Sequence, residues 1–169
     1  MAVRLNSPKI GDLAGIKGLR LGVARAHIKK PNRRDLLLMV LSPRAQLAAV
    51  FTQNKFCAAP VIIARQHLQS GSSIRALLVN TGNANAGTGE AGLAHASEVC
   101  RATGELLSCA PQQILPFSTG VIMEPLPVGK IIQALPACVA DLKEDNWLNA
   151  ALAIMTTDTV PKAVSKKIE

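Results

Sequence analysis

The feature that most limits the fold of this chain is a series of short apolar runs, each bounded by proline, asparagine or serine. Runs of about four to eight apolar residues are typical of buried strands, because helices need longer periodic segments. We therefore predict strands within 16–24, 35–41, 46–52, 75–80 and 113–122, with a hairpin connection over 29–34. The run 60–64 leads into a short helical turn near 66–69.

Apolar residues spaced three to four apart predict helices in other parts of the chain, around 93–107, 131–142 and 147–155. Thr88 and Asp145 are the expected caps of the first and third of these helices. Pro136 lies inside the second pattern and predicts a kink or a break there. Strands mixed with helices, without regular strand–helix–strand alternation, favour the α+β class.

The length of 169 residues fits one domain spanning 1–169, and 49% hydrophobic residues supply its core. This composition excludes an intrinsically disordered chain. The chain contains no run of about 18 apolar residues and no secretory signal, so we expect a soluble intracellular protein without membrane contact.

The net charge of +8 raises nucleic acid as a partner. The basic residues, however, concentrate over 29–34 and 162–167, without a basic helical stripe or aromatic platforms for stacking bases. We interpret both clusters as a solvated turn and a solvated tail, and expect no nucleic-acid partner. The four cysteines and three histidines are dispersed without a C-x-x-C spacing, which predicts free thiols and no metal site.

Two polar segments could carry chemistry. The glycine-rich stretch 80–89 lies between a predicted strand and a predicted helix, but its spacing matches neither phosphate-binding motif, so a binding loop and a tight turn are both open. The hydroxyl-rich ends 118–120 and 156–159 could stabilise an oxyanion or could cap chain ends. There is no G-x-S-x-G elbow, and no histidine lies near a candidate nucleophile.

Four segments, in order, resemble the successive motifs of the ornithine acetyltransferase family, the glutamate N-acetyltransferases of the cyclic arginine pathway. They are Val50 to Pro60, Leu77 to Gly89, Pro116 to Ile122 with Leu126-Pro127, and Ala153 to Thr159 with Pro161-Lys162. The resemblance covers nearly the whole chain from about Gly15 onward.

The resemblance implies a precursor that cuts itself before an internal threonine, which becomes the nucleophile at the start of a β chain. This chain resembles the α chain, and it stops before the family's Lys-Gly-x-Gly-Met segment. The implied architecture is a layered α/β/β/α-type sandwich completed by the β chain, in a cytoplasmic α2β2 heterotetramer.

Carried over by motif, the hydroxyl of Thr119 and the N–H of Gly120 match the family's oxyanion pair, and Thr156 matches a substrate-binding position. Met123 departs from the family pattern, because many members carry glycine there, so the turn beyond the oxyanion pair is expected to differ in shape.

The implied reaction is ping-pong transfer of an acetyl group from N-acetylornithine to glutamate, without a metal or cofactor. Some family members also use acetyl-CoA as the donor, and these residues leave that open. Two alternatives remain at this point: a self-processing aminopeptidase or amidase of similar architecture, and a non-catalytic basic binding module.

Overall fold

A computed structural model describes residues 7–168 of the chain. Its strands form one sheet in the order β1 (Leu19–Ala24), β2 (Leu36–Leu41), β3 (Ala76–Asn83) and β4 (Ile114–Val121). β1 and β2 form an antiparallel pair, as do β2 and β3, whereas β3 and β4 run parallel. The parallel pair brings the carboxyl ends of β3 and β4 to the same edge of the sheet.

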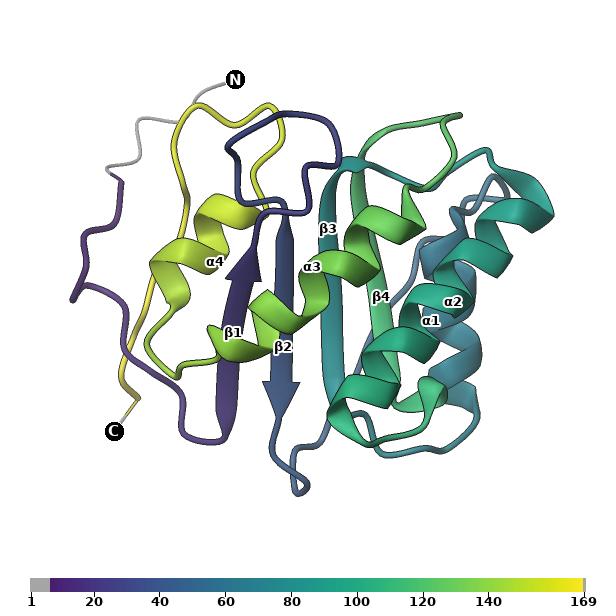
Figure 1. Cartoon of the computed structure of the whole chain (residues 1–169). Coiled ribbons are helices and arrows are strands. Elements are labelled where there is room, and N and C mark those ends of the chain that lie inside the picture. The colour runs from purple at the N-terminus through teal and green to yellow at the C-terminus, as the bar shows by residue number, and fades with distance from the viewer. Residues whose placement is uncertain (1–6, 169) are drawn as a thin grey trace.

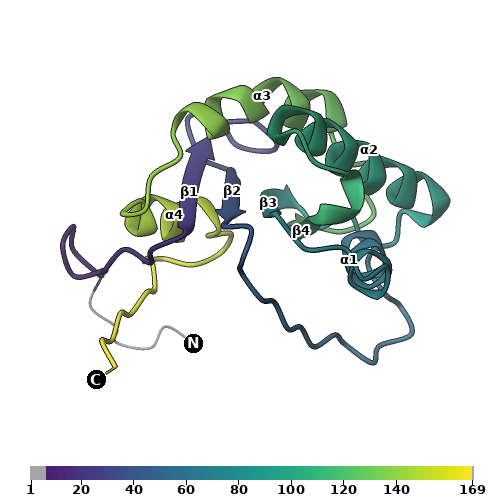
Figure 2. The same cartoon turned by 90° about the horizontal axis from the view of Figure 1, so that it is seen from below.

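The four α-helices among residues 7–168 cover the two faces of this sheet (Figures 1 and 2). They are α1 (Ala59–Gln69), α2 (Gly89–Leu107), α3 (Val128–Ala140) and α4 (Trp147–Ala153), and a short 3-10 turn, η1 (Pro111–Gln113), precedes β4. Figure 2 shows α2 and α3 on one face of the sheet and α1 and α4 on the other. The α+β class is confirmed, and the second sheet of a four-layer sandwich stays a prediction.

The alternation of side chains along β2 explains the helices on both faces. Leu36 and Leu38 are buried in the core cluster that includes α2 and α3, whereas Leu37 packs in a second cluster with α4. A third cluster joins the other end of this face to α1. Because successive strand residues point to opposite faces, a continuous apolar run is what a strand covered on both sides requires.

One expected strand is wrong. Residues 46–52 form no strand: they are extended coil, from which Leu47 and Phe51 reach the cluster beside α1. The helical turn expected near 66–69 is present but begins earlier, because 60–64 also belongs to α1, an eleven-residue helix with Pro60 in its first turn, where the missing N–H costs nothing.

Of the kink or break predicted at Pro136, the break is wrong, because α3 continues through this residue. Ile131, Leu135 and Cys138 of this helix are fully buried, so packing of its apolar face offsets the lost backbone hydrogen bond. Thr88 does precede α2, but its hydroxyl donates to Asn85 Oδ1 and accepts no N–H from the first turn of the helix.

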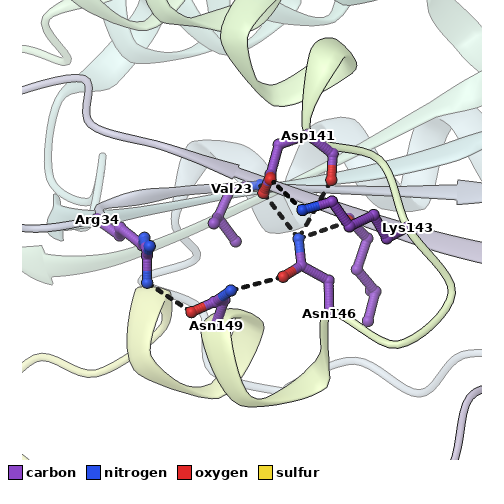
Figure 3. A network of polar contacts seen from close by, with 7 residues as sticks. Val23, Arg34, Asp141, Lys143, Asn146 and Asn149 are labelled. Atoms are coloured by element: carbon purple, nitrogen blue, oxygen red, sulfur yellow. Dashed lines mark hydrogen bonds and ion pairs between the residues drawn. The ribbon is translucent and has the colours of Figure 1, made fainter.

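α4 is preceded by Asn146 rather than by Asp145. The Asn146 amide donates to the carbonyl of Leu21 in β1 and to the carboxylate of Asp141, which follows α3. The Asp141 carboxylate also accepts the Val23 N–H (Figure 3). This network attaches the α3–α4 connection to the edge strand. No helix among residues 7–168 is both long and apolar enough to cross a membrane.

Candidate active site

A pocket of about 380 Å³ opens at the carboxyl ends of β3 and β4. It is lined by the β1–β2 connection over 29–35, by the strand ends 81–82 and 119–121, and by 155–157 after α4. Its volume lies within the range of small-molecule sites, and the carboxyl ends of parallel strands are a common place for them.

All three site residues predicted from the sequence lie in this pocket. Thr119 and Gly120 come from the end of β4, and Thr156 comes from the segment that follows α4. We call Thr119 and Gly120 the oxyanion corner. The structure therefore brings together groups that the sequence separates by more than thirty positions.

Two Thr-Gly pairs lie side by side at this edge. Thr81 of β3 is in register with Thr119 of β4, and Gly82 is in register with Gly120. Thr81 is buried, and its hydroxyl donates to the carbonyl of Ala153 at the end of α4 over 3.1 Å. Thr119 is half-buried at the pocket surface. The two threonines thus have different tasks, because Thr81 fixes α4 to the sheet while Thr119 lies where a ligand can reach it.

Gly120 has no room for a side chain. Its φ of 139° lies in the region that favours glycine. A Cβ there would lie 2.4 Å from the carbonyl carbon of Gly82 and 2.6 Å from the nitrogen of Asn83. The close approach of the two strand ends therefore requires glycine, and it leaves the backbone of residue 120 exposed beside the Thr119 hydroxyl.

The asparagines of the glycine-rich stretch are structural. Asn80, Asn83 and Asn85 are all buried. Their amides donate, respectively, to the carbonyl of Asn83 at 2.8 Å, of Pro125 at 3.1 Å and of Gly92 at 2.9 Å. These bonds satisfy groups that would be costly to bury unpaired. Of the two interpretations of this stretch, the tight turn accounts for its asparagines, and the stretch lines the pocket only through its Thr-Gly pair.

The cluster over 29–34 lies in the connection between β1 and β2 and is largely exposed, as expected for a solvated turn, but Lys29, Lys30 and Arg33 also line the pocket, which the sequence did not predict. We call these three residues the basic wall. No local signal distinguishes a pocket wall from a solvated turn here, because both are polar and rich in lysine and arginine. The residue that could have indicated an ordered loop is Asp35, because its carboxylate directly precedes an apolar strand.

Asp35 fixes the loop that carries the lysines. Its carboxylate is 3% exposed and accepts the N–H groups of Ala26 at 2.6 Å and Ile28 at 2.7 Å. Both carboxylate oxygens are thus used by the backbone of the same connection. A buried, charge-assisted anchor of this kind holds the following residues in one position.

Arg33 fixes the opposite segment. Its guanidinium donates to the carbonyl oxygens of Met155 and Thr156. Just beyond, the Lys162 ammonium donates to Asp158 and lowers the pKa of that carboxyl. The β1–β2 connection therefore holds Thr156 at the pocket through the backbone rather than through its side chain.

The turn after the oxyanion corner contains Met123 at a φ of 62°. Its N–H donates to the carbonyl of Ala86 at 2.8 Å. A positive φ is the conformation for which glycine is best suited, so methionine occupies a glycine-type position here. Among residues 7–168, no three His, Cys, Asp or Glu side chains gather into a group able to hold a metal ion.

A mixed sheet whose parallel strand ends present a threonine and an exposed glycine to one pocket is suited to an acyl-transferring enzyme, in which a carbonyl oxygen gains negative charge. The model of the ArgJ family matches residues 20–169. The chain belongs to the ArgJ family and is an acyltransferase of arginine biosynthesis.

Two crystal structures are similar to this chain. One is the ornithine acetyltransferase of Mycobacterium tuberculosis in complex with ornithine, with 34% identity, a TM-score of 0.80, and 85% of this chain and 78% of that chain covered. The other is the arginine biosynthesis bifunctional protein ArgJ of Bacillus halodurans, with 31% identity, a TM-score of 0.71, and 85% and 75% covered.

Proposed function

We propose that this chain forms part of the active site of a glutamate N-acetyltransferase, which moves an acetyl group from N-acetylornithine to glutamate. The observation that carries this proposal is the single pocket that contains the oxyanion corner and Thr156. Family membership and the similar ornithine acetyltransferase support the choice of substrates.

The proposed reaction has two halves. A threonine hydroxyl attacks the acetyl carbonyl of N-acetylornithine, and the oxygen of the tetrahedral intermediate is held by the Thr119 hydroxyl and the Gly120 N–H. Collapse of the intermediate breaks the amide bond and releases ornithine, whose nitrogen takes up the proton of the hydroxyl. The amine of glutamate then attacks the acetyl ester, the ester C–O bond breaks, and the amine proton passes to the threonine oxygen, which gives N-acetylglutamate and the free threonine. This exchange requires neither a metal nor a cofactor.

The attacking threonine is proposed to come from a β chain made by self-cleavage of the same precursor and assembled with this chain as α2β2. Thr119 also lines a second, mainly apolar cavity of about 430 Å³ on the α1 side of the sheet. Val50 and Phe117 at this cavity are 98% and 42% exposed. An exposed apolar surface that continues from the oxyanion corner supports docking of a second chain there.

The substrate-binding role proposed for Thr156 fits its position. Arg33 holds its carbonyl, Thr156 lines the pocket, and its hydroxyl forms no hydrogen bond among residues 7–168. A hydroxyl in this position can hydrogen-bond a polar group of the bound substrate in both halves of the reaction. Such a contact contributes to binding more than to the chemical step.

The test uses the protein expressed from its complete gene, mixed with N-acetylornithine with and without glutamate. Release of ornithine that rises with glutamate, together with formation of N-acetylglutamate, is the expected result. Ornithine release that glutamate does not increase would indicate a hydrolase. Absence of acetyl transfer, with salt-sensitive retention on nucleic acid, would support the basic binding module instead. A parallel assay with acetyl-CoA and glutamate tests the second donor.

A further inference from the structure

The pocket has an excess of positive charge. Lys29, Lys30 and Arg33 line it, and the one carboxylate among its lining residues is Asp35. Both oxygens of Asp35 accept backbone N–H groups, so this carboxylate faces its own loop. The field in the pocket therefore favours a ligand that carries a negative charge.

Two of the three cations already have protein partners. The ammonium of Lys29 lies 2.7 Å from both carboxylate oxygens of Glu124, in the turn that follows β4. The guanidinium of Arg33 is directed at backbone carbonyls of 155–156. Lys30 is exposed and forms no ion pair within the described residues. Its ammonium is thus the group of the basic wall that is free to bind a ligand.

The backbone that carries Lys30 is held on both sides. Asp35 binds the N–H groups of residues 26 and 28, and the Lys130 ammonium of α3 donates to the carbonyl of His27 at 2.8 Å. Pro31 follows directly and restricts the conformation of Lys30. A cation on a fixed loop loses less freedom when it binds an anion, so preorganisation strengthens the contact.

We propose that Lys30 binds the α-carboxylate that N-acetylornithine and glutamate share, with Lys29 and Arg33 supplying the surrounding positive field. This inference rests on the proposed function and identifies the chemical class that the pocket accepts: N-acyl-α-amino acids as donors and α-amino acids as acceptors. Lys30 can serve in both half-reactions, because each substrate carries an α-carboxylate in the same position relative to its reacting nitrogen. The reacting nitrogen is then presented toward the oxyanion corner in each half.

A binding measurement tests this assignment. Titration calorimetry of the protein expressed from its complete gene compares glutamate with its α-carboxamide, isoglutamine, in wild type, Lys30→Met, Lys30→Arg and Lys17→Met. Lys17 is the matched control, because it is exposed, lies at the opposite end of β1 and does not line the pocket. A charge-assisted contact predicts that wild type and Lys17→Met bind glutamate about tenfold more tightly than isoglutamine.

Lys30→Met is expected to bind the two ligands equally, and Lys30→Arg is expected to retain most of the preference. In steady-state assays, Lys30→Met should raise KM for both substrates about tenfold and change kcat by less than about twofold. Persistence of the glutamate preference in Lys30→Met, or loss of it in Lys17→Met, overturns the assignment.

The two proposals fail in different ways. If wild type catalyses no acetyl exchange but its carboxylate preference depends on Lys30, the proposed function falls and the anion site stands. If acetyl exchange is present but Lys30→Met still distinguishes glutamate from isoglutamine, the anion site falls and the proposed function stands.

Discussion

At Gly120, one hydrogen atom in place of a side chain lets β4 lie against the end of β3. Gly120→Ala would place a Cβ within 2.4–2.7 Å of the backbone of Gly82 and Asn83. We expect the substitution to lower the free energy of unfolding by about 2–3 kcal/mol and to abolish acetyl transfer, because the strand ends must separate. Urea denaturation followed by circular dichroism measures the first effect.

Gly129→Ala is the control for this substitution. Gly129 lies in α3, with no atom within 4 Å of an added Cβ. Alanine there should be neutral or should stabilise the protein by up to about 1 kcal/mol, since it is the better helix former. Equal stability of the Gly120→Ala and Gly129→Ala proteins would contradict the close approach of β3 and β4.

The Thr119 hydroxyl can be removed with little effect on packing, because the residue is half-buried at the pocket surface. Thr119→Ala is expected to lower kcat by about 10²–10³-fold, the usual effect of losing one oxyanion donor. Thr119→Ser keeps the hydroxyl and should retain most of the activity. Wild-type turnover by the alanine variant would remove Thr119 from the site.

For Thr156, a different kinetic pattern is expected. If its hydroxyl contacts the substrate equally in the ground state and the transition state, Thr156→Val raises KM several-fold and leaves kcat nearly unchanged. Steady-state kinetics with both substrates measures this split. A loss confined to kcat would assign Thr156 to the chemical step instead.

At the scale of the elements, apolar runs identified most strands, but they did not show which runs pair with a neighbouring strand. The runs at 35–41, 75–80 and 113–122 contain β2, β3 and β4, and each of these strands pairs with a neighbouring strand. The run 46–52 has a similar composition, yet only Leu47 and Phe51 of it reach a core cluster. Local pattern cannot distinguish these cases, because strand formation depends on a neighbouring strand with which to pair.

The network between α3, α4 and β1 makes the stability of the fold depend on pH (Figure 3). Burial raises the pKa of Asp141, but hydrogen bonds from the Val23 N–H and the Asn146 amide, and the nearby Lys143 ammonium, outweigh it and lower the pKa below its ordinary value. The ionised carboxylate therefore stabilises the folded state at pH values above the pKa of Asp141 in the unfolded chain, which is about 4. This contribution is lost as the pH falls through the lowered pKa.

Asp141→Asn should therefore be less stable than wild type at pH 7 by about 1–2 kcal/mol, through weakened charged hydrogen bonds. The difference should shrink as the pH falls below about 4, where the wild-type carboxylate becomes protonated. Asp145→Asn, at an exposed neighbouring position, serves as the control. Denaturation midpoints measured from pH 3 to 7 decide the matter, and a difference independent of pH would refute it.

For the whole molecule, the hydroxyl and glycine residues of the site were easier to predict than the basic wall of the pocket. Thr119, Gly120 and Thr156 were identifiable by residue type and by resemblance, and one pocket contains all three. The basic wall was missed, because its role arises from contacts between residues 29–35 and 155–157 that no local pattern encodes. Spacing in the sequence indicates only which residues share one helix or strand. This pocket, in contrast, is formed by segments that are distant in the sequence.

Thiol reactivity should report unfolding of the whole chain. Burial raises the pKa of Cys100 and Cys138 to about 12, so neither forms the reactive thiolate in the folded protein near neutral pH. Labelling at pH 8 is expected to spare both until the core opens, and their modification should follow the rate of global unfolding. Mass spectrometry of digested, labelled protein locates each modified cysteine. Rapid labelling of either buried thiol in native buffer would contradict the packed core between α2 and α3.

The bonds from Arg33 to the carbonyls of Met155 and Thr156 span 122 and 123 positions of the chain. During synthesis, the basic wall leaves the ribosome long before the segment that completes the pocket. A nascent chain therefore passes through a long interval in which it can pair β1 with β2 but has no finished cavity. Premature termination between β4 and α4 would produce a polypeptide that contains Thr119 and Gly120 but lacks the segment 155–157 on the other side of the pocket.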